Sequence, residues 1–312
     1  MSLLAQLRSL LPRSFAGRAA LGASLVYATC TGILWAFHRA FIFPAPRSGL
    51  APTLSGSTLL KLDAEGSDVV ALYAPPSGAS TARAAPLRGG LGVPQAARDG
   101  GVVVFFHGNG QELVDLSWLA RSFMNQGLGI LFVEYPGYGL AKGETTEANI
   151  YFAAKRALDE LQRLGVAKSQ ITLVGQSLGS GVAIEMARGG YGSKLVLISP
   201  FTSMVDMVKR FAPLLPVSAL VRDRFDNLAK APEVPVETLV IHGTKDGLVP
   251  VSMGREIAAA IPNAKLIEIE GGSHNDLFTS RGASASGSET LRLIIDAAKR
   301  GESRDRPNPL AN

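Results

Sequence analysis

A five-residue turn carries the strongest chemical signal in the sequence: Gly175-Gln176-Ser177-Leu178-Gly179. It follows an apolar run, Ile171–Val174, and precedes a helical pattern that begins at Gly181. In a strand-to-helix turn of this kind the serine sits on a strained backbone, and only small residues fit two positions before and after it. The following helix points free N–H groups toward developing negative charge. The pattern predicts that Ser177 is a nucleophile, and a glycine-rich turn with an incidental serine is the alternative.

A serine nucleophile needs a base, and the base needs an orienting carboxylate. With a turn of this type the order along the chain is serine, acid, histidine. The chain has four histidines. Three of them precede the acid candidate named below: His38, His107 and His242. We therefore predict that His274, in the stretch Gly271–Asn275 after a strand-like run, is the base; a surface loop histidine is the alternative.

Asp246 is the carboxylate that we expect to orient His274. It closes a turn that comes immediately after the apolar run Thr238–Ile241. A carboxylate at that strand end can reach an imidazole carried by the adjacent strand end. Three other carboxylates follow Ser199 and are expected to cap helices or face solvent: Asp206, Asp223 and Asp226.

The predicted oxyanion hole consists of two backbone donors. One is the N–H of Leu178, the residue after the nucleophile. The other comes from the loop His107–Gly110, which follows the apolar run Val102–Phe106. We predict the N–H of Asn109 for this second position, with Gly110 as the alternative donor. An ordinary strand-ending turn is the competing interpretation of this loop.

Short apolar, β-branched runs alternate with helical patterns along the chain. The strand-like runs are Val69–Ala74, Val102–His107, Gly129–Glu134, Ile171–Gly175, Lys194–Ser199, Thr238–His242 and Lys265–Ile269. Several are apolar nearly throughout, as in parallel strands covered on both faces. Helices are expected at Asn149–Leu164, at Ser252–Ala260 and from Ser288 to about residue 300. The alternation predicts an α/β protein with a doubly wound sheet.

Several stretches taken together resemble the α/β-hydrolase superfamily, in particular the membrane-anchored serine hydrolases among the alpha/beta-hydrolase domain-containing proteins and their bacterial relatives. The stretches are Phe41–Pro44, His107–Gly110, Glu134–Gly139, Gly175–Gly179, Ser199–Ser203, His242–Asp246 and Gly272–His274. The resemblance covers residues 57–300. It implies the α/β-hydrolase fold, with a mostly parallel eight-stranded sheet, helices on both faces, and one N-terminal transmembrane or signal helix before it. The chain departs from the family in a long insertion, Pro75–Gly101.

An uncharged run of 19 residues, Ala19–Phe37, has close to the ~20 residues that cross a bilayer as a helix. Trp35 and Phe37 stand at its far end, where aromatic rings favour the interface. Basic residues flank it: Arg8, Arg13, Arg18, Arg39 and Arg47. We predict a single-pass anchor with the catalytic domain on the non-cytoplasmic side. Secretion after signal cleavage, or a helix buried against the domain, are the alternatives.

The charge distribution separates the two parts of the chain. Residues 1–100 hold nine Lys/Arg and four Asp/Glu, whereas residues 101–312 hold 22 of each. A balanced domain argues against nucleic-acid binding, and a basic N-terminal part favours anionic lipid. The expected division is an anchor with its juxtamembrane segment at 1–45, a hydrolase domain at 46–300 and a disordered tail at 301–312.

The single cysteine, Cys30, lies in the apolar run, so it offers neither a disulfide nor a nucleophile in the folded domain. No Cys/His cluster has metal-site spacing, and we expect no metal and no cofactor.

Together these features predict a serine hydrolase that cleaves carboxylic esters, including small-molecule or lipid acyl esters or thioesters at a membrane, through an acyl-enzyme on Ser177. A serine peptidase of the same fold is the alternative, although no substrate-filtering domain is evident. A non-catalytic scaffold is disfavoured because the set of serine, acid and histidine is complete. The segment Pro200–Glu237 is either a connection with one packed helix or a small cap that lines an acyl pocket. Its apolar residues are Phe201, Met204, Met207, Val208, Phe211, Leu214 and Leu215.

Overall fold

The computed structural model describes residues 14–64, 67–77, 100–278 and 284–299. Most of the expected insertion (residues 78–99) and all of the expected tail (301–312) lie outside the described residues, as do Arg8 and Arg13.

Eight strands form one sheet in the order β1-β2-β4-β3-β5-β6-β7-β8. Strand β2 runs antiparallel to β1 and to β4, and every other neighbouring pair is parallel. The mostly parallel eight-stranded sheet is therefore confirmed. The bounds are β1 Thr58–Ala64, β2 Ser67–Ala74, β3 Val102–Phe106, β4 Gly129–Glu134, β5 Ile171–Gln176, β6 Lys194–Ile198, β7 Glu237–Gly243 and β8 Ala264–Ile269.

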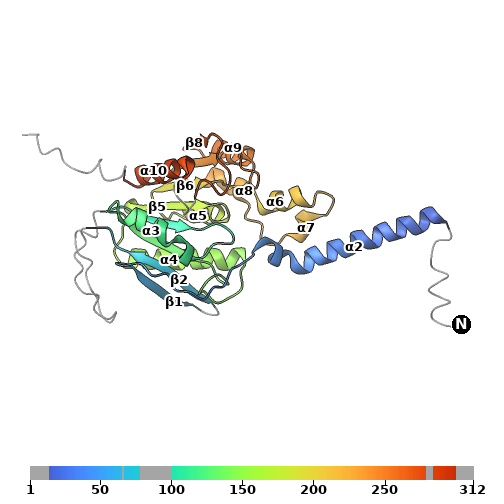
Figure 1. Ribbon diagram of the computed structural model, residues 1–312, viewed down its shortest axis with the longest axis horizontal. Helices are drawn as coiled ribbons and strands as arrows, with labels where there is room; N and C mark the ends of the chain where they lie inside the picture. Colours follow the sequence, from blue (N-terminus) through green and yellow to red (C-terminus); the bar gives the residue numbers. More distant parts are fainter. Residues whose placement is uncertain (1–13, 65–66, 78–99, 279–283, 300–312) are drawn as a thin grey trace, which may run out of the picture.

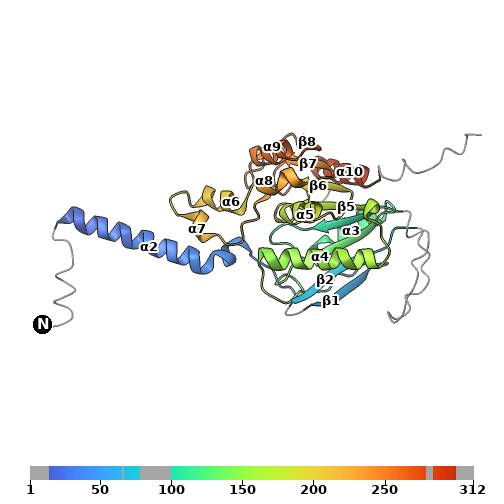
Figure 2. The same cartoon turned by 180° about the vertical axis from the view of Figure 1, so that it is seen from behind.

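Helices cover both faces of this sheet (Figures 1 and 2). Helices α4, α5 and α9 pack on one face, and α3 and α10 pack on the other. In β3, Val104 and Phe106 belong to the first of these cores, whereas Val103 and Phe105 belong to the second. Both faces of the central strands are thus buried, which explains their continuous apolar sequences. The helix bounds are α3 Ser117–Met124, α4 Glu147–Arg163, α5 Leu178–Arg188, α9 Val251–Ala260 and α10 Ala285–Lys299.

The connection between β6 and β7 contains three short helices instead of one. They are α6 (Met204–Phe211), α7 (Val217–Leu220) and α8 (Asn227–Lys230), and a 3-10 turn at Ala231–Glu233 follows. Helices α6 and α7 project from the body of the domain beside the near end of α2 (Figures 1 and 2). The cap interpretation of this segment therefore describes it better than a plain connection.

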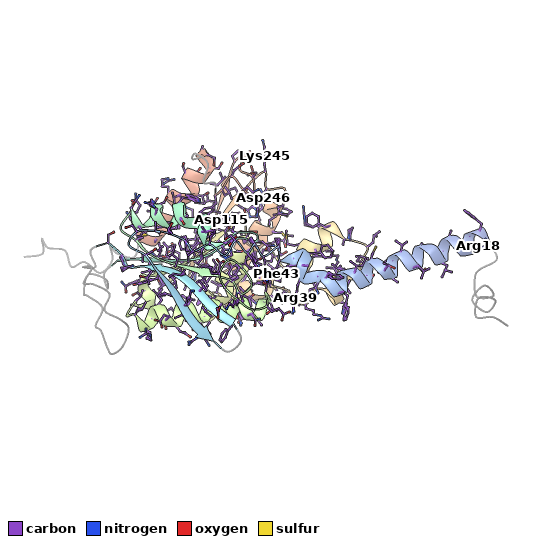
Figure 3. All side chains as sticks on the ribbon, turned by 60° about the horizontal axis from the view of Figure 1, so that its bottom comes forward. Arg18, Arg39, Phe43, Asp115, Lys245 and Asp246 are labelled. Carbon is purple, nitrogen blue, oxygen red and sulfur yellow. The ribbon has the colours of Figure 1, made fainter. Side chains whose placement is uncertain are left out.

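Helix α2 (Phe15–Ile42) leaves the domain as a single long rod, with Arg18 toward its far end and Arg39 next to the domain (Figure 3). Its N-terminus is capped by Ser14, whose hydroxyl oxygen accepts a hydrogen bond from the N–H of Gly17 at 3.0 Å. With 28 residues the helix is about 42 Å long, at ~1.5 Å per residue. None of its most apolar 18-residue window is buried. By length and composition α2 is a candidate transmembrane or signal helix, and its apolar window is not part of the core.

Candidate active site

Ser177 lies between β5 and α5 with φ 50° and ψ −115°. A positive φ is rare for a residue with a side chain, and it persists only where the surroundings fix it. The N–H of Ser177 donates to the carbonyl of Ile198 at 2.9 Å, which ties the turn to the neighbouring strand. A Cβ on Gly175 would collide with the carbonyl of Gly179, and a Cβ on Gly179 would collide with the carbonyl of Phe106. Backbone contacts therefore explain why glycine stands on both sides of the serine.

The structure brings Ser177, Asp246 and His274 together, as the sequence predicts. The Nε2 atom of His274 lies 3.1 Å from Oγ of Ser177, and its Nδ1 atom lies 2.7 Å from Oδ2 of Asp246. Asp246 comes from the turn after β7, and His274 comes from the loop after β8. With the proton on Nδ1, the imidazole donates to Asp246 and accepts the hydroxyl hydrogen of Ser177. This arrangement can perform general-base chemistry.

Asp246 is buried and receives several hydrogen bonds. Its Oδ1 atom accepts the backbone N–H groups of Leu248 at 3.0 Å and Val249 at 2.8 Å. Burial raises the pKa of Asp246, but hydrogen bonds from His242 and His274 outweigh it, so the net pKa lies well below the ordinary value. The side chain is therefore a carboxylate at neutral pH.

The competing carboxylates have structural partners elsewhere. Asp206 accepts from the hydroxyl of Ser203, the residue that caps α6. Asp223 pairs with Arg39 at 2.8 Å and accepts the first N–H of α4. Asp226 stands directly before α8. Among the described residues, the ring of His274 is hydrogen-bonded to Asp246 and Ser177 and to none of these three carboxylates.

The loop after β3 lines the same cavity as Ser177 through Asn109. Neither the N–H of Asn109 nor that of Leu178 has an acceptor among the residues that the structure describes. Both expected oxyanion donors are thus available to a ligand. By contrast, the N–H of Gly108 donates to the side chain of Gln111 at 2.8 Å and is already occupied.

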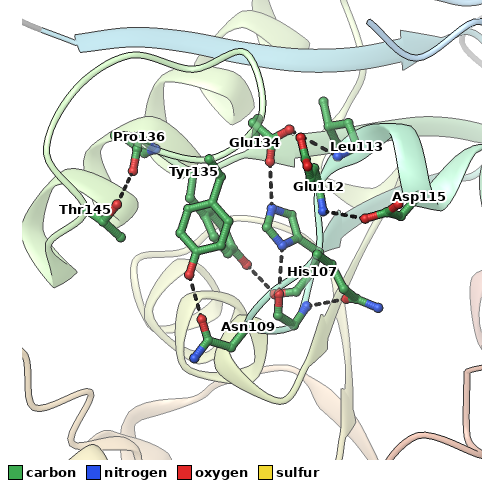
Figure 4. A network of polar contacts seen from close by, with 12 residues as sticks. His107, Asn109, Glu112, Leu113, Asp115, Glu134, Tyr135, Pro136 and Thr145 are labelled. Atoms are coloured by element: carbon green, nitrogen blue, oxygen red, sulfur yellow. Dashed lines mark hydrogen bonds and ion pairs between the residues drawn. The ribbon is translucent and has the colours of Figure 1, made fainter. Parts of the chain in front are cut away.

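A buried polar network, which the sequence patterns did not predict, holds this loop (Figure 4). The two ring nitrogens of His107 lie 3.0 Å from Oε1 of Glu134 and 2.9 Å from the carbonyl of Gly108. The Tyr135 hydroxyl donates to the carbonyl of His107 at 2.7 Å. Glu134 and Tyr135 are polar residues at the end of a buried, apolar strand. That position is the sequence feature that could have indicated the network.

The side chain of Asn109 connects the loop to two further segments. Its Oδ1 atom accepts a hydrogen bond from the hydroxyl of Tyr138 at 2.6 Å. Its Nδ2 group donates to the carbonyl of Ile42, the last residue of α2. The backbone of the candidate oxyanion loop is therefore fixed partly by the end of the N-terminal helix.

A cavity of about 510 Å³ opens beside Ser177. Six of the seven apolar residues that the sequence suggested for an acyl pocket line it, whereas Leu214, which is 85% exposed, does not. The N-terminal helix also contributes to the lining, and nothing in the sequence pattern indicated this.

Comparisons with known proteins place this chain among hydrolases. The Hydrolase_4 family, described as serine aminopeptidase S33, matches residues 97–228. An uncharacterized protein of Mycobacterium tuberculosis is 30% identical over 64% of this chain and 69% of its own length. Alpha/beta hydrolase domain-containing protein aho-3 of Caenorhabditis elegans is 32% identical over 62% of this chain and 57% of its own length. The chain belongs to the α/β-hydrolase superfamily.

Solved structures of the superfamily share the fold. The Est2 esterase of Thermogutta terrifontis superimposes with a TM-score of 0.57, at 17% identity, over 78% of this chain and 94% of its own. The EaEST esterase of Exiguobacterium antarcticum superimposes with a TM-score of 0.56, at 16% identity, over 78% of this chain and 99% of its own. At such identities the likeness establishes the α/β-hydrolase fold, and together with the family match it supports hydrolase activity.

Proposed function

We propose that this protein is a serine hydrolase that cleaves carboxylic esters through an acyl-enzyme on Ser177. The supporting observation is the hydrogen-bonded series from Asp246 through His274 to Ser177, which opens into an apolar cavity. Membership of the superfamily supports hydrolysis as the class of reaction. The arrangement of the site supports an ester as the substrate.

In the first half of the proposed reaction, Oγ of Ser177 attacks the carbonyl carbon while Nε2 of His274 takes its proton. The N–H groups of Leu178 and Asn109 donate to the resulting oxyanion. His274 then gives the proton to the leaving alcohol as the carbon–oxygen bond breaks. In the second half His274 deprotonates a water, which attacks the acyl carbon, and the acid is released as Ser177 regains its proton.

A peptidase is the second candidate, because the matching family is described as a serine aminopeptidase. An aminopeptidase has to hold a charged ammonium group beside the nucleophile, and burying such a charge requires a partner. No acidic residue is among the described residues that line the cavity. The lining therefore favours an acyl chain over a peptide N-terminus.

Ser177→Ala tests the proposal directly. We expect turnover of p-nitrophenyl esters to fall roughly 10⁴-fold or more, because the three residues act as a unit. A fluorophosphonate should label the wild type and not the variant, whereas Ser193→Ala, on a loop remote from His274, should behave as wild type. Equal labelling of the wild type and Ser177→Ala would reject Ser177 as the nucleophile. Cleavage of aminoacyl p-nitroanilides without any ester hydrolysis would favour the peptidase.

We also propose that α2 anchors the protein in a membrane and that the hydrolase domain, from about residue 46, lies on the non-cytoplasmic side. The exposed apolar window and the arginine at the far end of α2 support the anchor. Secretion after signal cleavage is the competing proposal.

A further inference from the structure

The cavity beside Ser177 is suited to a hydrocarbon chain. Its volume of about 510 Å³ falls within the ~300–1,000 Å³ of small-molecule sites. Apart from Cys30, Asn109 and Ser177, every described residue that lines it is apolar. An acyl chain attached through an ester to Ser177 would therefore contact mainly hydrocarbon side chains.

Helix α2 supplies one wall of this cavity. Cys30, Ile33, Leu34 and Phe41 line it, and these positions share one helix face. The first three belong to the uncharged run that is long enough to lie in a bilayer. The pocket wall and the candidate membrane segment are thus the same stretch of chain.

A second part of the cavity lining comes from α6 and the residues after it. Met204, Met207, Val208 and Leu215 line the cavity. At the end of α6 and in the connection to α7, Phe211 is 71% exposed and Leu214 is 85% exposed, and α7 itself contacts α2. Large apolar side chains that gather on a surface mark a contact with another apolar phase. These exposed side chains belong to a cap that contacts a candidate membrane helix. The apolar phase that they would contact is therefore a lipid surface.

The helix is held firmly against the cap. The guanidinium of Arg39 pairs with buried Asp223 at 2.8 Å, and the guanidinium of Arg222 lies 5.1 Å from the centre of the Trp35 ring. The carbonyl of Ile42 accepts from Asn109 of the candidate oxyanion loop. The wall that α2 provides is therefore fixed relative to Ser177.

We propose that α2 is both the anchor and a wall of the acyl pocket, and that the substrate is a long-chain acyl ester of a bilayer lipid whose chain enters along α2. This inference rests on the proposed ester hydrolysis at Ser177. The ester group reaches Ser177 while its chain passes from the hydrocarbon of the bilayer into the hydrocarbon of the pocket, so no apolar surface crosses water.

The test compares two tryptophan substitutions in the full-length protein in detergent micelles. Leu34→Trp puts a bulky ring into the pocket wall, whereas Leu25→Trp places the same ring on the same helix, outside the cavity and on the opposite face. Both variants keep the anchor, so tethering is equal. The readout is the ratio of kcat/KM for p-nitrophenyl palmitate to that for p-nitrophenyl butyrate.

We expect Leu34→Trp to lower this ratio at least about tenfold, as for pockets that discriminate by shape, and Leu25→Trp to keep the wild-type ratio. Ile33→Trp, on the same wall, should act like Leu34→Trp. Ratios within twofold of wild type in both wall variants, with Ser177 still labelled by a short fluorophosphonate, would overturn the inference. A wild type that neither hydrolyses esters nor is labelled would instead overturn the proposed function.

The only cysteine of the chain provides a measurement that needs no substitution. Cys30 lines the pocket and is exposed. A long-chain fluorophosphonate on Ser177 should slow alkylation of Cys30 by a small maleimide severalfold, whereas an ethyl fluorophosphonate should not. Equal alkylation rates with the two probes would contradict a chain that lies along α2.

Discussion

At the scale of single residues, the proposed mechanism requires Asp246 to remain charged and to orient His274. Asparagine has the same shape but offers an amide to Nδ1, which favours the wrong imidazole tautomer. We expect Asp246→Asn to lower kcat roughly 10⁴-fold, as in serine proteases. The measurement is ester turnover beside circular dichroism. Asp226→Asn is the matched control, since Asp226 stands before α8 without a side-chain cap bond. A larger loss of kcat in Asp226→Asn than in Asp246→Asn, with both variants folded, would identify Asp226 as the carboxylate that orients His274.

The polar residues of the site differ in how far sequence predicts them. Ser177, Asp246 and His274 each follow a recognisable strand, so chain order and strand ends suffice to bring them to one edge of the sheet. The role of Glu134 depends instead on how close the end of β4 lies to His107. The bond from Asn109 to Ile42 joins segments 67 residues apart. Such pairings depend on tertiary packing, which local patterns do not encode.

At the scale of elements, the turn between β5 and α5 depends on how closely the helix approaches β3. A methyl group on Gly179 would meet the carbonyl oxygens of Phe106 and His107, and backbone cannot move aside as a side chain can. We expect Gly179→Ala to destabilise the fold by about 1–3 kcal/mol or more, seen as a lower midpoint of thermal unfolding in detergent. Gly247→Ala, in open space, should change stability by less than about 1 kcal/mol. Equal midpoints for the two variants would contradict this packing.

The strands were easier to predict than the ends of the helices. Both faces of the central strands are buried, so their sequences are apolar throughout. Strand β1 does not stand out as an apolar run in the sequence, because it is an edge strand whose seven residues include Lys61 and Asp63. Helix α4 begins before Asn149 because Thr146 accepts the N–H of that residue as its cap. Caps of this kind shift helix boundaries without changing the apolar pattern.

At the scale of the whole molecule, the sequence separates an apolar N-terminal run from a folded domain, and the structure joins the two. Ile42 and Phe43 are buried in one of the cores. The C-terminal half of α2, from Cys30 onward, lines the cavity beside Ser177. An uncharged run has no polar face that would indicate which side meets a partner. The wall that α2 provides could therefore be recognised only from its position beside the cap.

Two kinds of interaction could hold this protein on a membrane. A spanning α2 would hold the protein through burial of its apolar run, whereas the basic residues around it would attract anionic lipid only electrostatically. At 1 M salt the Debye length is about 3 Å, so the electrostatic part is screened while the hydrophobic part remains. We expect the full-length protein to stay with membranes through a 1 M salt wash and to leave them in detergent. An intact mass that includes Arg18 would exclude signal cleavage. Release of the protein by salt alone would mean that α2 does not span the bilayer, and the route for the acyl chain along it would then have to be abandoned.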